Sequence, residues 1–173
     1  QLAEYGAMFD GDVQGLKETL RDVSYGETVA AIDDHWARVT ASSGLPFAAG
    51  QAVRSGLDAA ARAPDANPLL GMLAPDTANI ERARVLAAAD MRAARLVTRL
   101  RAYRLANGRY PDSLAAFSGR DFTVDPFTGQ PFVYHVDGDD FVLYSLGADG
   151  VDHGGLHDRR AVEGDYVIWP RQP

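Results

Sequence analysis

Residues 86–111 read LAAADMRAARLVTRLRAYRLANGRYP, and this stretch decides the fold. No glycine or proline interrupts the chain from Thr77, a suitable N-cap, to Ala106. Asn107-Gly108 supplies a left-handed stop, and Pro111 follows shortly after. The pattern predicts a helix over 77–106, roughly 45 Å long, with one apolar seam. The seam residues recur at steps of three and four: Leu86, Ala89, Ala93, Leu96, Leu100 and Tyr103.

Beyond Pro111 the apolar period changes from that of a helix to that of strands. Residues 132–136 and 141–144 are rich in β-branched and aromatic side chains, and Asp137-Gly138 between them is a strong hairpin signal. Residues 166–169 predict a last short strand, and 114–117 a short turn of helix. The sequence therefore predicts an α+β fold, in which the long helix packs on a small antiparallel sheet. The aromatic residues expected between them are Phe127, Phe132, Tyr134, Phe141 and Tyr144.

The residues before the long helix read as shorter helices separated by Gly/Pro punctuation. Apolar spacing predicts helices at about 12–23, with Asp12 as its N-cap, at 27–40 and at 48–63. The apolar face of the second is expected to hold Val29, Ile32, Trp36 and Val39. Pro64, Asn67 and Pro68 are expected to break the chain. We therefore expect a helical extension at 1–75 and a helix-plus-sheet domain at 76–173.

Composition and charge narrow the function. The chain is 46% hydrophobic, enough to bury a core, and its net charge of −7 disfavours non-specific binding to nucleic acid or anionic lipid. It has no cysteine, so disulfides and thiol chemistry are excluded. No apolar run reaches the roughly 18 residues of a membrane-spanning helix. From Asp112 to Asp165 there are eleven acids against three arginines, and many of these acids fall in predicted turns.

The densest group of acids lies in a glycine-rich loop. Residues 146–155 read LGADGVDHGG, and 163–165 read EGD. Carboxylates crowded into one loop repel each other unless a cation lies among them, and calcium takes six to eight oxygen ligands in a flexible shell. The carboxylates in question are Asp149, Asp152, Glu163 and Asp165. A solvated acidic loop is the alternative.

Other metal and catalytic readings fit less well. The loop is not an EF-hand, because acids do not fall at the required positions in either register. Zinc is disfavoured without cysteine, although His153 and His157 are available. No nucleophile elbow, P-loop or dinucleotide fingerprint is present. We therefore expect a protein that is not an enzyme; a metal-dependent hydrolase using this loop with His153 or His157 is the remaining catalytic alternative.

Four short segments carry a further signal in their order along the chain. They are YRLANGRYP (103–111), DPFTGQPFVY (125–134), FVLYSLGADG (141–150) and EGDYVIW (163–169). In this order they resemble the C-terminal globular domain of the major, G-type pseudopilin of type II secretion systems. The resemblance covers about 65 residues, between 103 and 169. It implies that the long helix is the pilin helix, that it packs on the sheet, and that the last loop holds calcium.

The resemblance also implies a ligand set and a role. It assigns to Ca²⁺ the carbonyl of Leu146 and the side chains of Asp149 and Asp165, with Glu163 where the family has an aspartate; Asp152 is added on chemical grounds alone. We expect a non-catalytic structural or assembly protein of a bacterial envelope or protein-transport system, periplasmic or extracellular. Its expected contacts are protein partners or other copies of itself, with membrane attachment only through an upstream anchor. The alternative is a soluble, calcium-stabilised binding module of a larger membrane-associated envelope protein.

Overall fold

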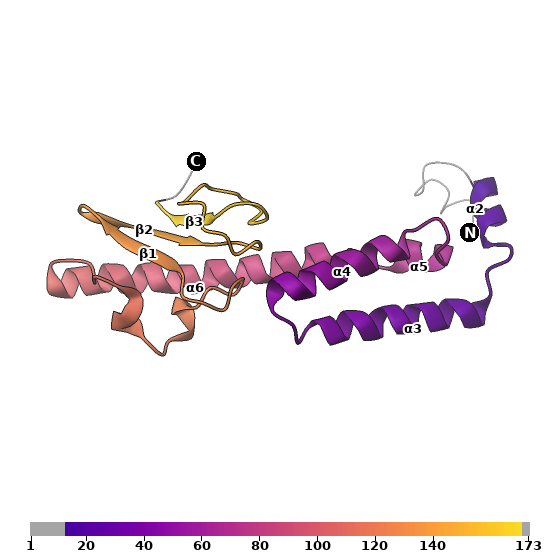
Figure 1. The fold of residues 1–173 in the computed structure, drawn as a ribbon, viewed down its shortest axis with the longest axis horizontal. Helices are drawn as coiled ribbons and strands as arrows, with labels where there is room; N and C mark the ends of the chain where they lie inside the picture. The colour runs from indigo at the N-terminus through magenta and orange to yellow at the C-terminus, as the bar shows by residue number, and fades with distance from the viewer. Residues whose placement is uncertain (1–12, 171–173) are drawn as a thin grey trace. The chain divides into compact units, whose positions relative to one another are not determined.

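The computed structural model describes residues 13–170, which form helices followed by a small antiparallel sheet, so the predicted α+β class is confirmed (Figure 1). The described residues divide into two units by their contacts. The first consists of residues up to Gly44 together with Ala52–Ala78, and the second of Leu45–Gln51 together with residues from Asn79 onward. Among the helices of residues 13–170, none combines the length and apolar character needed to cross a membrane.

The first unit is helical. It contains α2 (Val13–Leu20), α3 (Tyr25–Ser42), the part of α4 (Phe47–Ala61) from Ala52 onward, and α5 (Pro68–Leu73). These bounds confirm the predicted helices at 27–40 and 48–63 to within a few residues, while the predicted N-cap Asp12 lies outside the described residues.

The buried face of α3 differs from the predicted one. Thr28, His35 and Ser42 are buried, whereas Trp36 is 43% exposed and Val29 is 38% exposed. The buried Thr28 hydroxyl accepts a 3.0 Å hydrogen bond from Asn67 Nδ2. Ile32 and Val39 of the predicted face are half-buried, so the covered face of α3 is shifted from the predicted one and not opposite to it.

The short helix α5 was not predicted, because Pro68 by itself indicates a break in the chain. Asn67 caps it, accepting hydrogen bonds from the amides of Leu69 and Leu70, and Pro68 occupies the first turn, where a missing N–H costs nothing. Gly71 lets α5 approach α4 closely, since a Cβ there would lie 2.7 Å from the carbonyl oxygen of Ala61.

The long helix α6 (Thr77–Asn107) confirms the main prediction. Its first residues are held by Asp58 of α4, which accepts hydrogen bonds of 2.8 Å from the Thr77 hydroxyl and 2.9 Å from the Ala78 amide. At its other end, Gly108 adopts a φ of 76° and donates to the Arg104 carbonyl at 2.8 Å.

The sheet of the second unit follows the predicted order of segments. Strands β1 (Val133–Asp137), β2 (Asp140–Ser145) and β3 (Tyr166–Trp169) pair antiparallel in the order β1-β2-β3. The hairpin register places Asp137 opposite Asp140, with Gly138 at positive φ in the turn. Two 3₁₀ turns, η1 (Leu114–Phe117) and η2 (Asp121–Thr123), lie between α6 and the sheet in the chain.

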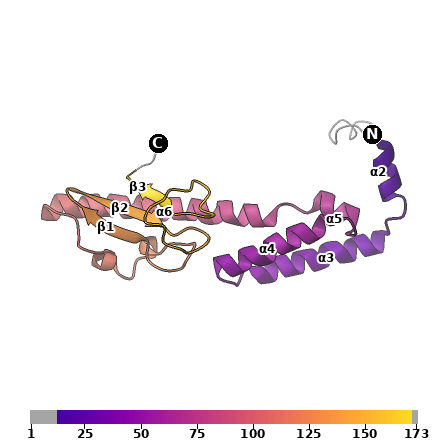
Figure 2. The same ribbon diagram turned by 45° about the horizontal axis from the view of Figure 1, so that its top comes forward.

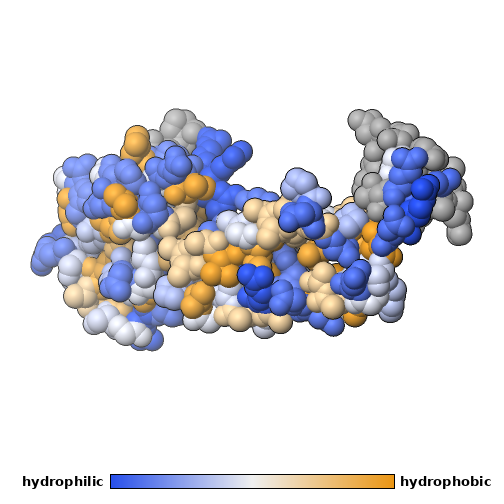
Figure 3. All heavy atoms as spheres, turned by 45° about the vertical axis from the view of Figure 1, so that its right-hand side comes forward, coloured by the Kyte–Doolittle hydropathy of each residue, from blue (hydrophilic) through white to orange (hydrophobic). Residues whose placement is uncertain are grey.

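The core of the second unit lies between α6 and the sheet, which runs alongside the helix in both ribbon views (Figures 1 and 2). Leu96 and Leu100 of the helix and Leu143 of β2 have no exposed surface, and Phe141 is 1% exposed. Full burial of each such side chain contributes about 1.5–3 kcal/mol. Apolar side chains also reach the surface among hydrophilic ones, as one face of the molecule shows (Figure 3).

Candidate metal centre

The acidic loop between β2 and β3 begins at a buried polar anchor. Ser145, the last residue of β2, donates a 2.8 Å hydrogen bond to Asp125 and accepts one of 3.0 Å from the Gly147 amide. The Asp125 carboxylate also accepts hydrogen bonds from the amides of Phe127 and Leu146. Burial raises the pKa of Asp125, and these hydrogen bonds only partly oppose the shift. The start of the loop is therefore fixed by the preceding DPFTG turn.

The loop then folds back on itself at Gly147. This residue has a φ of 69°, and a Cβ on it would lie 2.6 Å from the Gly164 carbonyl oxygen and 3.1 Å from that of Ala161. The amide of the next residue, Ala148, donates to the Ala161 carbonyl at 2.8 Å. Only glycine fits a position that is both left-handed and this crowded. The two ends of the loop, around 147 and around 161–164, are thus held against each other.

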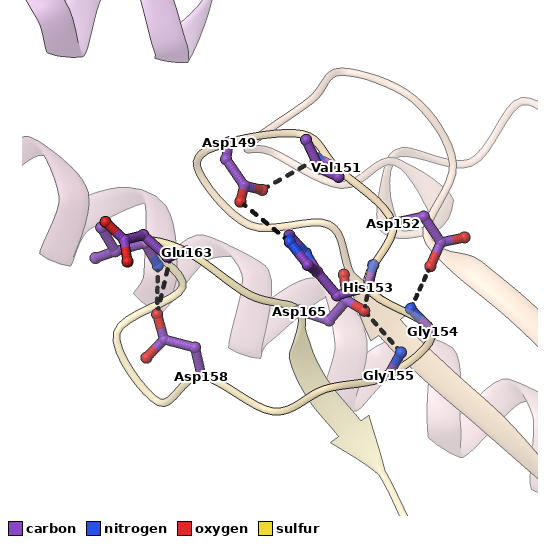
Figure 4. Close-up of polar contacts among 10 residues, drawn as sticks. Asp149, Val151, Asp152, His153, Gly154, Gly155, Asp158, Glu163 and Asp165 are labelled. Carbon is purple, nitrogen blue, oxygen red and sulfur yellow. Dashed lines mark hydrogen bonds and ion pairs between the residues drawn. The ribbon is translucent and has the colours of Figure 1, made fainter.

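Asp165 occupies the interior of the loop. Its side chain has no exposed surface, and its Oδ2 accepts hydrogen bonds from the amides of Gly155 (2.7 Å) and His153 (3.1 Å) (Figure 4). Its Oδ1 is buried and has no hydrogen-bond partner among the described residues. A buried carboxylate oxygen without a partner costs free energy, so it is a suitable ligand for a cation.

Asp149 is the predicted ligand linked most directly to Asp165. Its Oδ1 accepts from the Val151 amide at 3.0 Å, and its Oδ2 lies 3.9 Å from Nε2 of His153, the residue whose amide binds Asp165. Figure 4 shows His153 between the two aspartates. The two carboxylates therefore share a neighbour but do not touch each other.

Asp152 and Glu163 point elsewhere. Oδ1 of Asp152 accepts from the Tyr144 hydroxyl at 2.9 Å and from the Gly154 amide at 2.8 Å. Burial, with Asp152 as a second cause, raises the pKa of Tyr144 to about 12. Glu163 is exposed, and Figure 4 shows its carboxylate turned away from Asp165. Leu146, the predicted carbonyl ligand, is half-buried at the start of the loop.

The role of Asp158 was not predicted from the sequence. Its carboxylate accepts hydrogen bonds from the amides of Arg160 (2.8 Å), Val162 (2.7 Å) and Glu163 (3.2 Å). Partial burial opposes its charged form, but these amides outweigh that effect and lower the pKa of Asp158. The residue type was the signal in the sequence that could have identified this role, because aspartate side chains in loops commonly accept hydrogen bonds from the backbone amides that follow them.

The two histidines of the loop differ in position. His157 Nδ1 accepts a 3.1 Å hydrogen bond from the Val167 amide of β3. This nitrogen therefore binds the strand and is not directed at the carboxylates of the acidic loop. Within residues 13–170 no three His, Cys, Asp or Glu side chains gather closely enough to form a metal-binding group. The loop therefore offers one buried carboxylate with a spare oxygen, backbone carbonyls, and acids on its exposed rim.

Comparison with known proteins adds no relative: no family model, curated protein or solved structure matches this chain.

Proposed function

We propose that this chain is a non-catalytic, extracytoplasmic structural or assembly protein that resembles a type II secretion pseudopilin and holds Ca²⁺ in the loop between β2 and β3. The observation that carries the proposal is the buried Oδ1 of Asp165, which has no partner inside the described part of the chain. An ion bound there would offset the cost of burying that charge.

The donor set favours calcium over other metals. Asp165 is the central ligand of the proposal, with Asp149 next because His153 joins it to Asp165. The Leu146 carbonyl, Asp152 and Glu163 complete the proposed set. Asp149, Asp152 and Glu163 are exposed residues, and an ion would have to draw Asp149 and Asp152 from the hydrogen bonds that they accept from Val151, Tyr144 and Gly154. Oxygen donors of this kind suit calcium, which accepts irregular shells, whereas magnesium demands a near-ideal octahedron.

The role of the ion in this proposal is to stabilise the fold. Asp165 is the residue immediately before β3, so an ion on it would tie the last strand to the loop that follows β2. Binding to the folded state alone would stabilise the protein by about 2.7 kcal/mol at a hundredfold excess of calcium over Kd. Weak sites of this type are filled at the millimolar calcium found outside cells.

A thermal melt tests the proposal. The protein is melted in EDTA, in millimolar Ca²⁺ and in millimolar Mg²⁺, with unfolding followed by circular dichroism. We expect the melting temperature to rise by several degrees with calcium and to change little with magnesium. Identical melting curves in the three conditions would rule out the calcium site. Sedimentation of the same samples tests assembly, since concentration-dependent oligomers support a self-assembling protein and a strict monomer supports the binding-module alternative.

A further inference from the structure

A groove in the second unit has no role in the calcium proposal. It lies beside β3, has a volume of about 1040 Å³, and is lined by one face of α6, by β3 and by residues of the preceding loop. Figure 1 shows β3 next to β2, on the side of the sheet away from β1. The lining residues used below are Ala94, Val97, Arg101, Ile168 and Trp169.

We propose that this groove binds an extended peptide segment of a partner protein, one that carries apolar side chains and at least one carboxylate. The inference rests on the non-catalytic, partner-binding role proposed above and names where the partner binds. It does not require the calcium ion to contact the partner.

The groove offers partly covered apolar surface. Val97 of α6 and Ile168 and Trp169 of β3 are half-buried residues packed against the core, and each also lines the groove. Ala94 contributes a small side chain that keeps the groove open along the helix. Burying such surface under a peptide side chain contributes about 25 cal/mol per Å² removed from water.

The groove also presents a cation that is held in place before binding. The Arg101 guanidinium lies 4.5 Å from the centre of the Trp169 ring. That ring stacks on Phe141 at 5.9 Å, and its Nε1 donates a 3.0 Å hydrogen bond to Asp140. Arg101 is exposed and forms no ion pair within residues 13–170. A guanidinium fixed by stacking keeps its planar edge available for a carboxylate.

Charge in the groove favours an anionic occupant. The cation that its lining offers is Arg101, whereas the lining acid Asp90 already accepts a 2.7 Å hydrogen bond from the Tyr166 hydroxyl through Oδ1. Complementary charge gives orientation and specificity to such a contact.

The edge of β3 indicates that recognition does not extend the sheet. The Val167 amide donates to the His157 side chain, and the backbone of Asp165, just before β3, pairs with that of Asp158. A partner strand would have to displace these bonds. Small-molecule sites have volumes of about 300–1,000 Å³, and the volume of this groove is at the upper limit of that range. A groove of this size suits a peptide segment that lies along it and places its side chains inside.

Fluorescence anisotropy with defined peptide pools tests the inference. The first probe is a fluorescein-labelled pool of octapeptides containing Asp or Glu at two positions and Leu, Val, Phe or Ser elsewhere. The second is the same pool with Asn and Gln in place of the acids. We expect the wild-type chain in calcium buffer to bind the acidic pool at least threefold more tightly than the amide pool.

Three variants locate the binding. Arg101→Gln is expected to weaken binding of the acidic pool by about three- to tenfold. Ala94→Phe, which fills the groove from an exposed helical position, is expected to abolish it. Arg99→Gln is the matched control, because Arg99 is an exposed arginine of the same helix that does not line the groove, and it is expected to bind as wild type.

Circular dichroism melts confirm that each variant is folded, and calcium-dependent melting of the same samples reports separately on the calcium site. Equal binding of both pools, or unchanged binding in both groove variants, overturns the proposal. Vesicles of phosphatidylglycerol and of phosphatidylcholine are included as further probes. Binding of the anionic vesicles without binding of the peptides would assign the groove to lipid and also overturn it.

Discussion

The Ser145 hydroxyl donates a 2.8 Å hydrogen bond to Oδ2 of Asp125, although the two residues lie 20 positions apart in the chain. Ser145 has no exposed surface and Asp125 is 1% exposed, so neither can turn to water for a replacement partner. This contact joins the DPFTG turn to the first residues of the acidic loop, two of the segments on which the proposed likeness to a pseudopilin depends.

Replacing Ser145 with alanine tests the strength of this anchor. The change leaves the Gly147 amide without its acceptor and Asp125 without its hydroxyl donor. We expect the free energy of unfolding to fall by about 1–3 kcal/mol, the cost of leaving buried polar groups unpaired. Urea denaturation measures the loss. Ser118→Ala, at an exposed serine, serves as control and is expected to change stability by less than about 0.5 kcal/mol.

Asp165→Asn separates the cost of a buried charge from the benefit of an ion. In EDTA the variant is expected to melt at or above the wild-type temperature, because it no longer buries an unpaired negative charge. In calcium only the wild type is expected to gain stability, so the order of the two proteins reverses. Asp33→Asn, at an exposed carboxylate of α3, should respond to calcium as wild type does. A full calcium response in Asp165→Asn would remove Asp165 from the site.

The remaining proposed ligands are expected to rank by their position in the loop. Asp149→Asn should reduce the calcium-induced shift in melting temperature more than Asp152→Asn or Glu163→Gln, because Asp149 alone shares His153 with Asp165. Isothermal titration with Ca²⁺ gives the Kd of each variant. If Asp152→Asn or Glu163→Gln weakened binding most, the ion would lie toward the rim of the loop and not beside Asp165.

Sequence reasoning succeeded where one local pattern determined the structure. The spacing that predicted the α6 seam is matched by the complete burial of Ala89, Leu96 and Leu100, and Asp137-Gly138 forms the expected hairpin. Long periodic helices and two-residue turns are encoded by neighbours in the chain, so they can be read without knowing the tertiary contacts.

Prediction from the sequence failed where a residue far away in the chain determined the local structure. The first residues of α6 are bound by Asp58, 19 and 20 positions earlier, and the buried Thr28 accepts a hydrogen bond from Asn67, 39 positions later. In the loop, the prediction placed the acids around one ion because they are close in sequence. In the structure Asp152 accepts a hydrogen bond from Tyr144, and Asp158, which was not predicted, accepts one from the Val162 amide. Spacing along the chain does not reveal which amide or hydroxyl will meet a given carboxylate.

Asp158→Ala is expected to destabilise the protein in a pH-dependent way. Three amides lose their acceptor, at a cost of about 1–2 kcal/mol near neutral pH. Because the folded-state pKa of Asp158 is lowered, its stabilising contribution is present above the ordinary aspartate pKa of about 3.9 and is lost as pH falls through the lower folded value. Urea denaturation at about pH 6 and about pH 3, without added calcium, should therefore show a smaller difference between wild type and variant at the lower pH. A difference that grew on acidification would contradict this assignment.

Tyr134 and Tyr144 are expected to ionise later than exposed tyrosines. Burial is the main cause that raises the pKa of each to about 12, and their hydroxyls donate to the Pro111 carbonyl and to Asp152. An ordinary tyrosine has a pKa of about 10. Because the folded pKa values are raised, these phenols contribute stability that is complete below about pH 10 and is lost as pH rises through about 12.

Ultraviolet titration of the folded protein should show late tyrosinate absorbance that Tyr134→Phe and Tyr144→Phe each reduce. Tyr25→Phe is the control, because Tyr25 is 86% exposed, and this change is expected to leave the late phase of the titration as in wild type. A wild-type titration with no late phase, in protein still folded by circular dichroism, would show that neither hydroxyl is held in its protonated form.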